Sequence, residues 1–143
     1  MKREYPERPL VGVGAVIVEG DRVVLVRRGA EPMAGQWSIP GGLLELGETM
    51  RAGAEREALE ETGLQIEAGE VLGVLDRIVP DADGKSRYHY VLIDFLCRRV
   101  AGELRSGGDA AEARWLRESE LVELGVAETA VKVIRKAMAE KKG

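Results

Sequence analysis

Hydrophobic residues along the chain fall into runs that are typical of β-strands and are separated by short polar turns. Residues 10–19 and 22–28 are rich in Val and Leu, and the Gly-Asp pair between them predicts a tight turn. Residues 29–36 contain Gly and small side chains and predict a loop. Residues 66–79 form a further strand-like run that two glycines interrupt. Residues 87–99 form the longest run, and its nearly continuous apolar stretch is typical of a central, buried strand.

Three other segments follow a helical pattern. Residues 50–62 are good helix formers, and Gly63 after them suits the position just beyond a helix C-terminus. Residues 118–124 predict a short helix, and residues 127–140 predict an amphipathic helix with one apolar side. A short strand is expected at residues 114–116. Strands on either side of one helix, followed by a terminal helix, predict a mixed sheet covered on both faces.

The composition indicates one globular domain that covers residues 1–143. Hydrophobic residues make up 45% of the chain and charged residues 32%. The net charge of −4 gives no broad electrostatic reason to bind nucleic acid or a membrane surface. Cys97 is the only cysteine, so the chain has no internal disulfide, and no apolar run approaches the length of a membrane span. A cytoplasmic protein is therefore expected.

One edge of the predicted helix over residues 50–62 carries more negative charge than helix stability favours. Glu57, Glu60 and Glu61 fall within a sector about 100° wide in its last two turns. Like charges three and four residues apart repel by about 0.2–0.5 kcal/mol per pair, and the helix C-terminus is itself partly negative. A solvated face would tolerate this cost. A hard divalent cation explains the cluster better, because Mg²⁺ binds carboxylate oxygens held in one place.

These glutamates belong to a longer pattern that resembles the signature of the Nudix hydrolase family. The nine fixed positions of that signature are occupied here by Gly42, Glu48, Arg56, Glu57, Ala58, Glu60, Glu61, Gly63 and Leu64. Ala58 is smaller than the usual aliphatic residue, which puts nothing catalytic in doubt. A pattern with nine specified positions is far more selective than a short glycine motif. Outside residues 38–64, the chain resembles the family only in the order of its elements.

The resemblance implies a fold and an activity. The fold would be the α/β/α Nudix sandwich, an α/β protein with a mixed β-sheet flanked by helices. The activity would be Mg²⁺-dependent hydrolysis of a phosphoanhydride in a small-molecule nucleotide, with Mn²⁺ as a substitute ion. Members of the family often form homodimers, so the resemblance makes a homodimer one expected assembly.

The resemblance also implies roles for individual residues. The family's metal-binding glutamates correspond to Glu57, Glu60 and Glu61, and its carbonyl ligand corresponds to Gly41. The helix geometry independently supports the first and last of these glutamates, which are four residues apart, reaching the same ion. The family's arginine corresponds to Arg56 and orients a glutamate through an ion pair. The simpler alternative is a surface Arg–Glu pair of little energetic value.

Two carboxylates have roles that the sequence leaves open. Glu48 is either an outer metal ligand or a capping residue at the helix N-terminus. A general base must take a proton from the attacking water, and Glu61 is one candidate. The family often supplies the base, or a further ligand, from the loop after the long strand. Within that loop we expect Glu112, close before Trp115, although a solvated loop carboxylate explains it equally well.

Two residues are candidates for substrate contacts. Arg28 ends the second strand, where some family members place a phosphate-binding arginine, and bidentate geometry suits that role. Tyr90 shares a strand face with Tyr88 and is a candidate to stack on a base. The alternatives are a hydrated arginine at the sheet edge and ordinary core packing of the tyrosines.

The signature identifies the bond and leaves the nucleotide open. The ADP-ribose pyrophosphatase subgroup carries a proline sixteen residues beyond the signature's last residue, and Pro80 stands there. Pro80 also has a structural explanation, because it begins a turn. ADP-ribose, cleaved to AMP and ribose 5-phosphate, is the favoured substrate.

Two alternative functions belong to other classes. One is a mutator-type nucleoside triphosphate pyrophosphohydrolase that sanitises the nucleotide pool. Such enzymes read the damaged base with an asparagine in the C-terminal part, and this chain contains no asparagine. The other is a non-catalytic nucleotide-binding Nudix module. The intact glutamates argue against it, because a module without metal would gain helix stability by losing the like-charge cluster.

Overall fold

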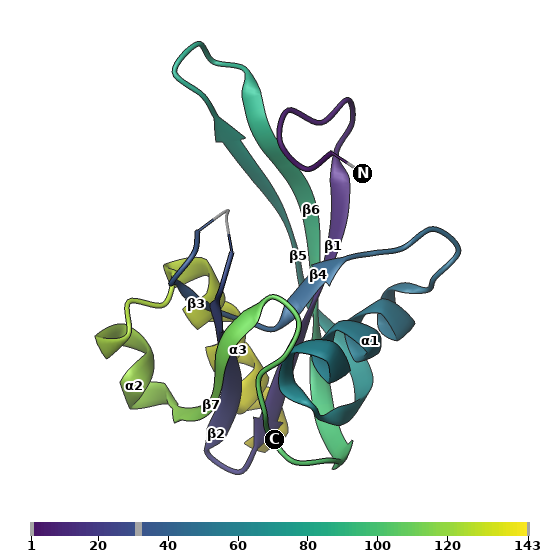
Figure 1. Cartoon of the computed structure of the whole chain (residues 1–143). Helices are drawn as coiled ribbons and strands as arrows, with labels where there is room; N and C mark the ends of the chain where they lie inside the picture. Colours follow the sequence, from purple (N-terminus) through teal and green to yellow (C-terminus); the bar gives the residue numbers. More distant parts are fainter. Residues whose placement is uncertain (1, 31–32, 143) are drawn as a thin grey trace.

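A mixed β-sheet runs through the centre of the protein in the computed structural model, which describes residues 2–30 and 33–142 (Figure 1). In chain order, the elements of this described part are β1 (Leu10–Glu19), β2 (Arg22–Arg28), β3 (Trp37–Ser38), β4 (Gly41–Leu43), α1 (Met50–Thr62), β5 (Gln65–Pro80), β6 (Ser86–Ala101), β7 (Ala110–Arg117), α2 (Glu118–Glu123) and α3 (Glu128–Lys142). The main strand order is β3-β2-β1-β6-β5, with β4 paired to β1 and β7 paired to β2. The predicted mixed sheet is confirmed.

Strand β1 connects the two halves of the sheet. It runs parallel to β6, with Leu10 opposite Tyr90 and Ile17 opposite Cys97, and antiparallel to β2 and β4. A parallel pair cannot be joined by a tight turn, and here the connection between β1 and β6 includes the helix α1. The predicted central strand at residues 87–99 is confirmed, because β6 lies between β1 and β5.

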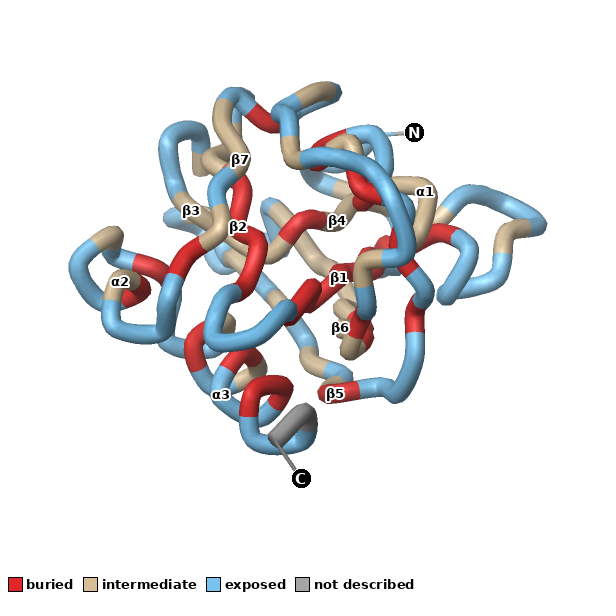
Figure 2. The backbone as a smooth tube through the Cα atoms, turned by 90° about the horizontal axis from the view of Figure 1, so that it is seen from below, coloured by how far each residue is buried: buried red, intermediate tan, exposed pale blue. Residues whose placement is uncertain are grey.

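Two hydrophobic cores lie on opposite faces of the sheet. Alternate residues of β1 supply both, because side chains alternate along a strand. Ala15 and Ile17 pack into the core that includes Ala58 of α1. Val16 and Val18 pack into the core that includes residues of α2 and α3. Figure 2 shows buried residues along β1 and β2 and on the inner sides of the flanking helices, as the predicted sandwich requires.

Helix α1 has the predicted bounds, and local chemistry fixes both of them. The side chain of Thr49 caps its start by accepting a hydrogen bond from the Ala52 N–H at 3.1 Å. Gly63 ends it with φ of 73°, a left-handed conformation that favours glycine, and donates its N–H to the Leu59 carbonyl. The side chains of Ala54 and Ala58 are buried and small, so the helix lies close against the sheet.

The β5–β6 hairpin is longer than the pattern predicts. β5 runs unbroken from Gln65 to Pro80, and the register shifts of its pairing with β6 absorb the irregularity that was expected to interrupt it near Gly69 and Gly73. The tip of the hairpin extends away from the rest of the sheet (Figure 1). Its turn is stabilised by the Asp81 carboxylate, which accepts hydrogen bonds from two backbone N–H groups.

The other predicted segments have mixed outcomes. The helices at residues 118–124 and 127–140 correspond to α2 and α3 with ends shifted by one or two residues. The loop at residues 29–36 includes residues 31–32, which lie outside the described part. The strand expected at residues 114–116 is longer, since β7 begins at Ala110. None of the described helices is long and apolar enough to cross a membrane.

Candidate active site

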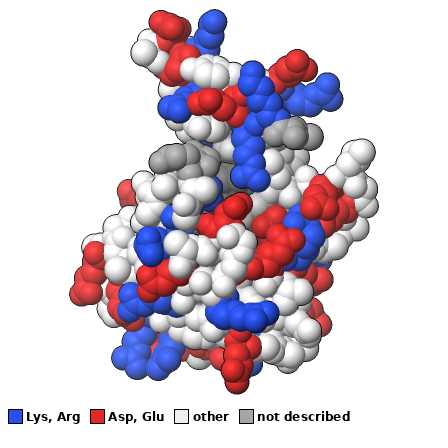
Figure 3. Space-filling view, in the orientation of Figure 1, with Lys and Arg blue, Asp and Glu red and all other residues white. Residues whose placement is uncertain are grey.

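The three glutamates that were predicted to bind metal line one hollow beside α1. Its volume is about 320 Å³, and its lining is formed by Arg3, Arg28, Gly41, Gly42, Glu45, Arg56, Glu57, Glu60, Glu61, Gly108 and Asp109. Figure 3 shows acidic side chains gathered in the middle of this face of the molecule, with basic side chains next to them. We call this site the acidic hollow. The helix edge that was predicted to hold a cation therefore faces a cavity.

Arg56 organises one side of the acidic hollow. Its Nε–H donates to Glu48 Oε2 at 2.7 Å and one Nη2–H donates to Glu48 Oε1 at 2.9 Å, a bidentate pair. The remaining guanidinium nitrogen, Nη1, donates to Glu57 Oε1 at 2.8 Å, and Nη2 also donates to the Leu43 carbonyl at 3.1 Å. Only 24% of the Arg56 side chain is exposed, so this is more than a solvated surface pair.

Glu48 does not cap the helix through its side chain, because Thr49 holds that position. The carboxylate of Glu48 accepts the Arg56 hydrogen bonds and the backbone N–H of Glu45. These bonds favour the ionised form, so they hold the pKa of Glu48 at about 2. Glu48 therefore fixes the arginine that in turn contacts Glu57.

Glu61 is the most buried carboxylate of the acidic hollow, with only 6% of the residue exposed. Its Oε1 accepts a hydrogen bond from the Gly41 N–H at 2.9 Å, which joins α1 to β4. Burial raises the pKa of Glu61 to about 7, and the negative charges of Glu57 and Asp109 act in the same direction. Without a bound cation, ionisation of the Glu61 carboxyl group near neutral pH is therefore energetically unfavourable.

Glu57 lies against the backbone of β4. A Cβ atom on Gly42 would come within 2.5 Å of the Glu57 carboxyl carbon, so a larger residue there would force this carboxyl group to move. Burial raises the pKa of Glu57, although the hydrogen bond from Arg56 opposes this shift. Glu60, four residues beyond Arg56, is more exposed, with 53% of its side chain accessible. The three glutamates therefore differ in how strongly the protein holds them.

The donor set fits a hard divalent cation. Within the described residues, no three carboxylate, imidazole or thiolate groups already converge as a metal site. Five carboxylates nevertheless line the acidic hollow, and burial and mutual repulsion raise the pKa of Glu57 and Glu61. A divalent cation would remove this electrostatic penalty, and oxygen ligands suit Mg²⁺.

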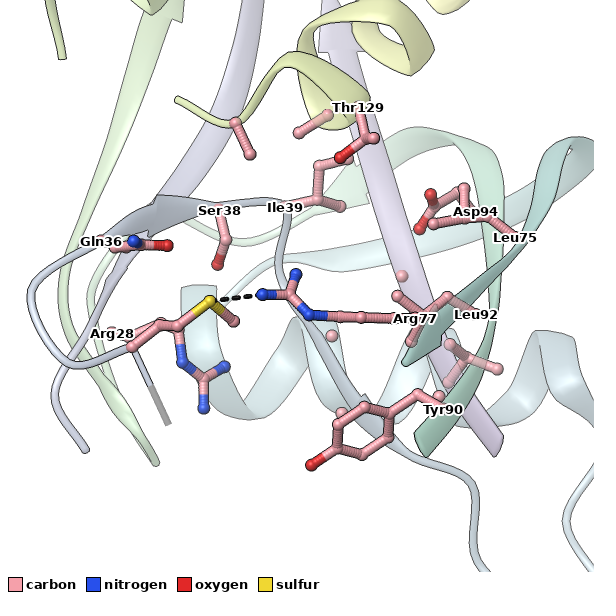
Figure 4. A pocket seen from close by; sticks show the side chains of 18 of the residues that line it. Arg28, Gln36, Ser38, Ile39, Leu75, Arg77, Tyr90, Leu92, Asp94 and Thr129 are labelled. Carbon is pink, nitrogen blue, oxygen red and sulfur yellow. Dashed lines mark hydrogen bonds between the residues drawn. The ribbon is translucent and has the colours of Figure 1, made fainter. Parts of the chain in front are cut away.

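An apolar pocket adjoins the acidic hollow. Its volume is about 210 Å³, and it shares Arg3, Arg28, Gly41 and Gly42 with the hollow. We call it the apolar pocket; its other lining residues include Trp37, Ile39, Leu75, Arg77, Tyr90, Leu92, Asp94 and Thr129 (Figure 4). A mostly apolar cavity with a few polar groups is typical of a site for a small organic ligand.

Both predicted substrate contacts line the apolar pocket, and one of them also lines the acidic hollow. Arg28 lines both cavities, and its positive charge lowers the pKa of Glu61, so it stands near the carboxylates. Tyr90 lines the apolar pocket. The ring of Tyr88 stacks on that of Tyr90 with centroids 6.3 Å apart. Their shared strand face, predicted from the alternation, is confirmed.

The structure places Glu112 differently from the prediction. It lies within β7 and not in a loop, because β7 already pairs with β2 there, with Arg27 opposite Glu112. Its carboxylate contacts Arg27 at 3.4 Å, and it is not among the residues that line the acidic hollow. Asp109, at the end of the preceding loop, lines the hollow instead.

Sequence reasoning missed three residues that line the apolar pocket. Trp37 forms part of its wall, and the guanidinium of Arg114 lies 5.7 Å from the centroid of the Trp37 ring. Arg77 donates a hydrogen bond to the sulfur of Met33 (Figure 4). Asp94 interrupts the apolar run of β6, and a single acidic residue in such a run is a signal that the sequence offers.

The fold and the site define an α/β sandwich protein in which a carboxylate-bearing helix borders a small-molecule pocket. The chain belongs to the NUDIX domain family, whose model matches residues 8–138. That family uses divalent metal cations, in agreement with the donor set of the acidic hollow.

Similar proteins carry two kinds of names. An ADP-ribose pyrophosphatase from Methanocaldococcus jannaschii is 36% identical over 116 residues, which are 81% of this chain and 66% of that protein. A MutT-like protein from Streptomyces ambofaciens is 33% identical over 77% of this chain and 64% of its own length. The crystal structure of a MutT NUDIX hydrolase from Burkholderia pseudomallei has a TM-score of 0.75 at 28% identity, covering 91% of this chain and 98% of that one. The chain spans slightly less than two thirds of the two sequence relatives.

Proposed function

We propose that the protein hydrolyses the pyrophosphate bond of a nucleoside diphosphate that is linked to a second group. The observation that carries this proposal is the junction of the two cavities at Arg28, Gly41 and Gly42. A nucleotide with its base in the apolar pocket would have its phosphates over the acidic hollow. The site therefore offers a recognition half and a hydrolytic half to one extended ligand.

The hydrolytic half would hold Mg²⁺, with Mn²⁺ as a substitute. The ligands would be Glu57, Glu60 and Glu61, together with the carbonyl oxygen of Gly41. When bound, the ion supplies positive charge to the phosphate oxygens and lowers the pKa of an attacking water. The residues themselves hold it at one edge of α1, next to the place where Arg28 would contact a phosphate.

Two further roles follow from contacts of the side chains. Arg56 positions Glu57 through its 2.8 Å hydrogen bond and is itself fixed by Glu48. Glu61, with a pKa of about 7, is suited to accept a proton from water near neutral pH. Asp109 also lines the hollow and is the other candidate to accept this proton.

ADP-ribose is the favoured substrate, with AMP and ribose 5-phosphate as products. The 36% identity to an ADP-ribose pyrophosphatase over 81% of this chain supports this choice, and Pro80 agrees with it. The similarity to MutT-like proteins supports the alternative, a mutator-type triphosphate pyrophosphohydrolase. The third interpretation is a nucleotide-binding module without catalysis.

Product analysis separates these three functions. The protein would be incubated with ADP-ribose and with a panel of nucleoside triphosphates, each with Mg²⁺, with Mn²⁺ and with a chelator. Release of AMP and ribose 5-phosphate supports the proposal, and release of pyrophosphate from a triphosphate supports the mutator-type alternative. Nucleotide binding without any turnover supports the non-catalytic module and contradicts the proposal.

A further inference from the structure

Asp94 is a carboxylate in the apolar pocket that the hydrolytic machinery does not use. It lies on β6, between Gly14 of β1 and Gly73 of β5 in the register of the sheet. A Cβ atom on Gly14 would collide with Asp94 Oδ1, so the glycine leaves room for this side chain. The neighbouring backbone therefore accommodates an acidic group inside the sheet, where an apolar one would be usual.

No partner for this carboxylate exists among the described residues. Neither a hydrogen-bond donor nor a cation of residues 2–30 and 33–142 contacts Asp94, and none of its oxygens is sealed off from the pocket. Burial raises the pKa of Asp94 to about 6, and no neighbouring charge contributes to that shift. A partly buried carboxylate without a partner is costly, and a ligand that donates a hydrogen bond would offset this cost.

The position of Asp94 in the pocket indicates which part of a ligand would reach it. Figure 4 shows Asp94 at the end near Ile39 and Thr129, whereas Arg28, which the acidic hollow shares, lies at the other end. Leu75 and Leu92 form apolar walls beside Asp94. A nucleotide with its phosphates near Arg28 would therefore present the edge of its base to Asp94.

We infer that Asp94 selects the nucleobase by accepting a hydrogen bond from an amino group on the base edge. This inference rests on the proposed function only for the orientation of the nucleotide. A carboxylate accepts from the 6-amino group of adenine, or from the N1–H and 2-amino group of guanine. Unsubstituted purine has neither an amino group nor an N–H on this edge, so its N1 acceptor would face a group that only accepts.

Binding of nucleoside monophosphates tests the inference without catalysis or a variant. AMP, GMP and purine riboside 5′-monophosphate would be titrated calorimetrically into the wild-type protein without metal. Since the loss of a hydrogen bond to a charged group leaves that group unpaired, we expect purine riboside 5′-monophosphate to bind at least about tenfold more weakly than AMP or GMP. Equal affinities for the three would overturn the inference.

The variant Asp94→Asn gives a result that a purely structural role would not. An amide can donate to N1 of unsubstituted purine, and it can also pair with N1 and the 6-amino group of adenine. We expect kcat/KM for purine riboside diphosphate ribose to rise about tenfold while ADP-ribose stays within about threefold. An unchanged ratio of the two rates in a folded variant would contradict the role of Asp94.

Asp76→Asn is the matched control. Asp76 lies on the adjacent strand β5 and is exposed, and it does not line the apolar pocket. It should leave the ratio of kcat/KM for ADP-ribose to kcat/KM for purine riboside diphosphate ribose unchanged. If the wild type hydrolyses no diphosphate compound and still prefers AMP or GMP over purine riboside 5′-monophosphate, the proposed function fails and the inference about Asp94 stands.

Discussion

Gly42 lies directly beneath the carboxyl group of Glu57, so that a Cβ atom at position 42 would come within 2.5 Å of it. The Gly42→Ala variant must displace this carboxyl. Because a shift of about 1 Å in a reacting group can slow an enzyme by about 100-fold, we expect kcat/KM to fall by about 10- to 100-fold. Gly73→Ala is the control, since the nearest atom to its new Cβ is an ordinary 4.0 Å away. Equal activities of the two variants would remove Glu57 from the metal ligands.

Arg56 should not be replaceable by lysine. The guanidinium contacts Glu48, Glu57 and Leu43 at once, and an ammonium group cannot reproduce that fork. We expect Arg56→Lys to lower kcat/KM by about 10- to 100-fold, as for other groups that orient metal ligands. Arg98→Lys is the control, because Arg98 pairs with Glu67 where both side chains are 66% exposed. A fully active Arg56→Lys enzyme would reduce Arg56 to a surface ion pair.

Glu61 should make stability depend on pH in the absence of metal. Its folded-state pKa of about 7 lies above the ordinary value of 4.5, so the folded state loses stability as the pH rises from about 4.5 to about 7. Glu61→Gln keeps an acceptor for the Gly41 N–H and removes the buried charge. We expect it to raise the free energy of unfolding by up to about 3 kcal/mol at pH 8 and to change it little at pH 4.

Urea denaturation at both pH values, in a chelator, measures this difference. Turnover of the Glu61→Gln variant should be almost lost, since the same residue is proposed as metal ligand and proton acceptor. A variant that is no more stable at pH 8 than the wild type would mean that Glu61 is not held in an unfavourable ionised state.

Variants of Asp109 and Glu112 test which of these two carboxylates acts as base or further metal ligand beside the three glutamates of α1. Asp109 lines the acidic hollow, whereas Glu112 contacts Arg27 and has 44% of its side chain exposed. We expect Asp109→Asn to slow turnover by at least about tenfold, in keeping with an acid–base or ligand role. Glu112→Gln should stay within about threefold of wild type. The reverse order, measured as kcat across pH, would restore Glu112 as the base.

The sequence predicts the local parts of this structure well. The bounds of α1 follow from good helix formers and from Gly63, whose left-handed φ ends the helix. The acidic edge of that helix was identified from the spacing of Glu57, Glu60 and Glu61 alone. These features depend on residues that are close in the chain, so their geometry can be read from local periodicity.

The pairing of strands that are distant in the sequence could not be predicted. Glu112 was expected in a loop because nothing local shows that β7 pairs with β2 from Ala110 onward. The position of Asp94 in a pocket could not be predicted from its apolar run. That position depends on Gly14 of the parallel neighbouring strand and on pocket walls that come from distant segments. Such contacts arise only when the whole sheet has formed.

The backbone at Gly41 and Gly42 has a consequence for how this protein can change over time. It separates the acidic hollow, drawn mainly from α1, from the apolar pocket, which includes residues of β5, β6 and the start of α3. Under the proposed function, substitutions in the apolar pocket would alter which molecule is accepted without disturbing bond cleavage. The architecture would then allow new specificities to evolve around an unchanged reaction.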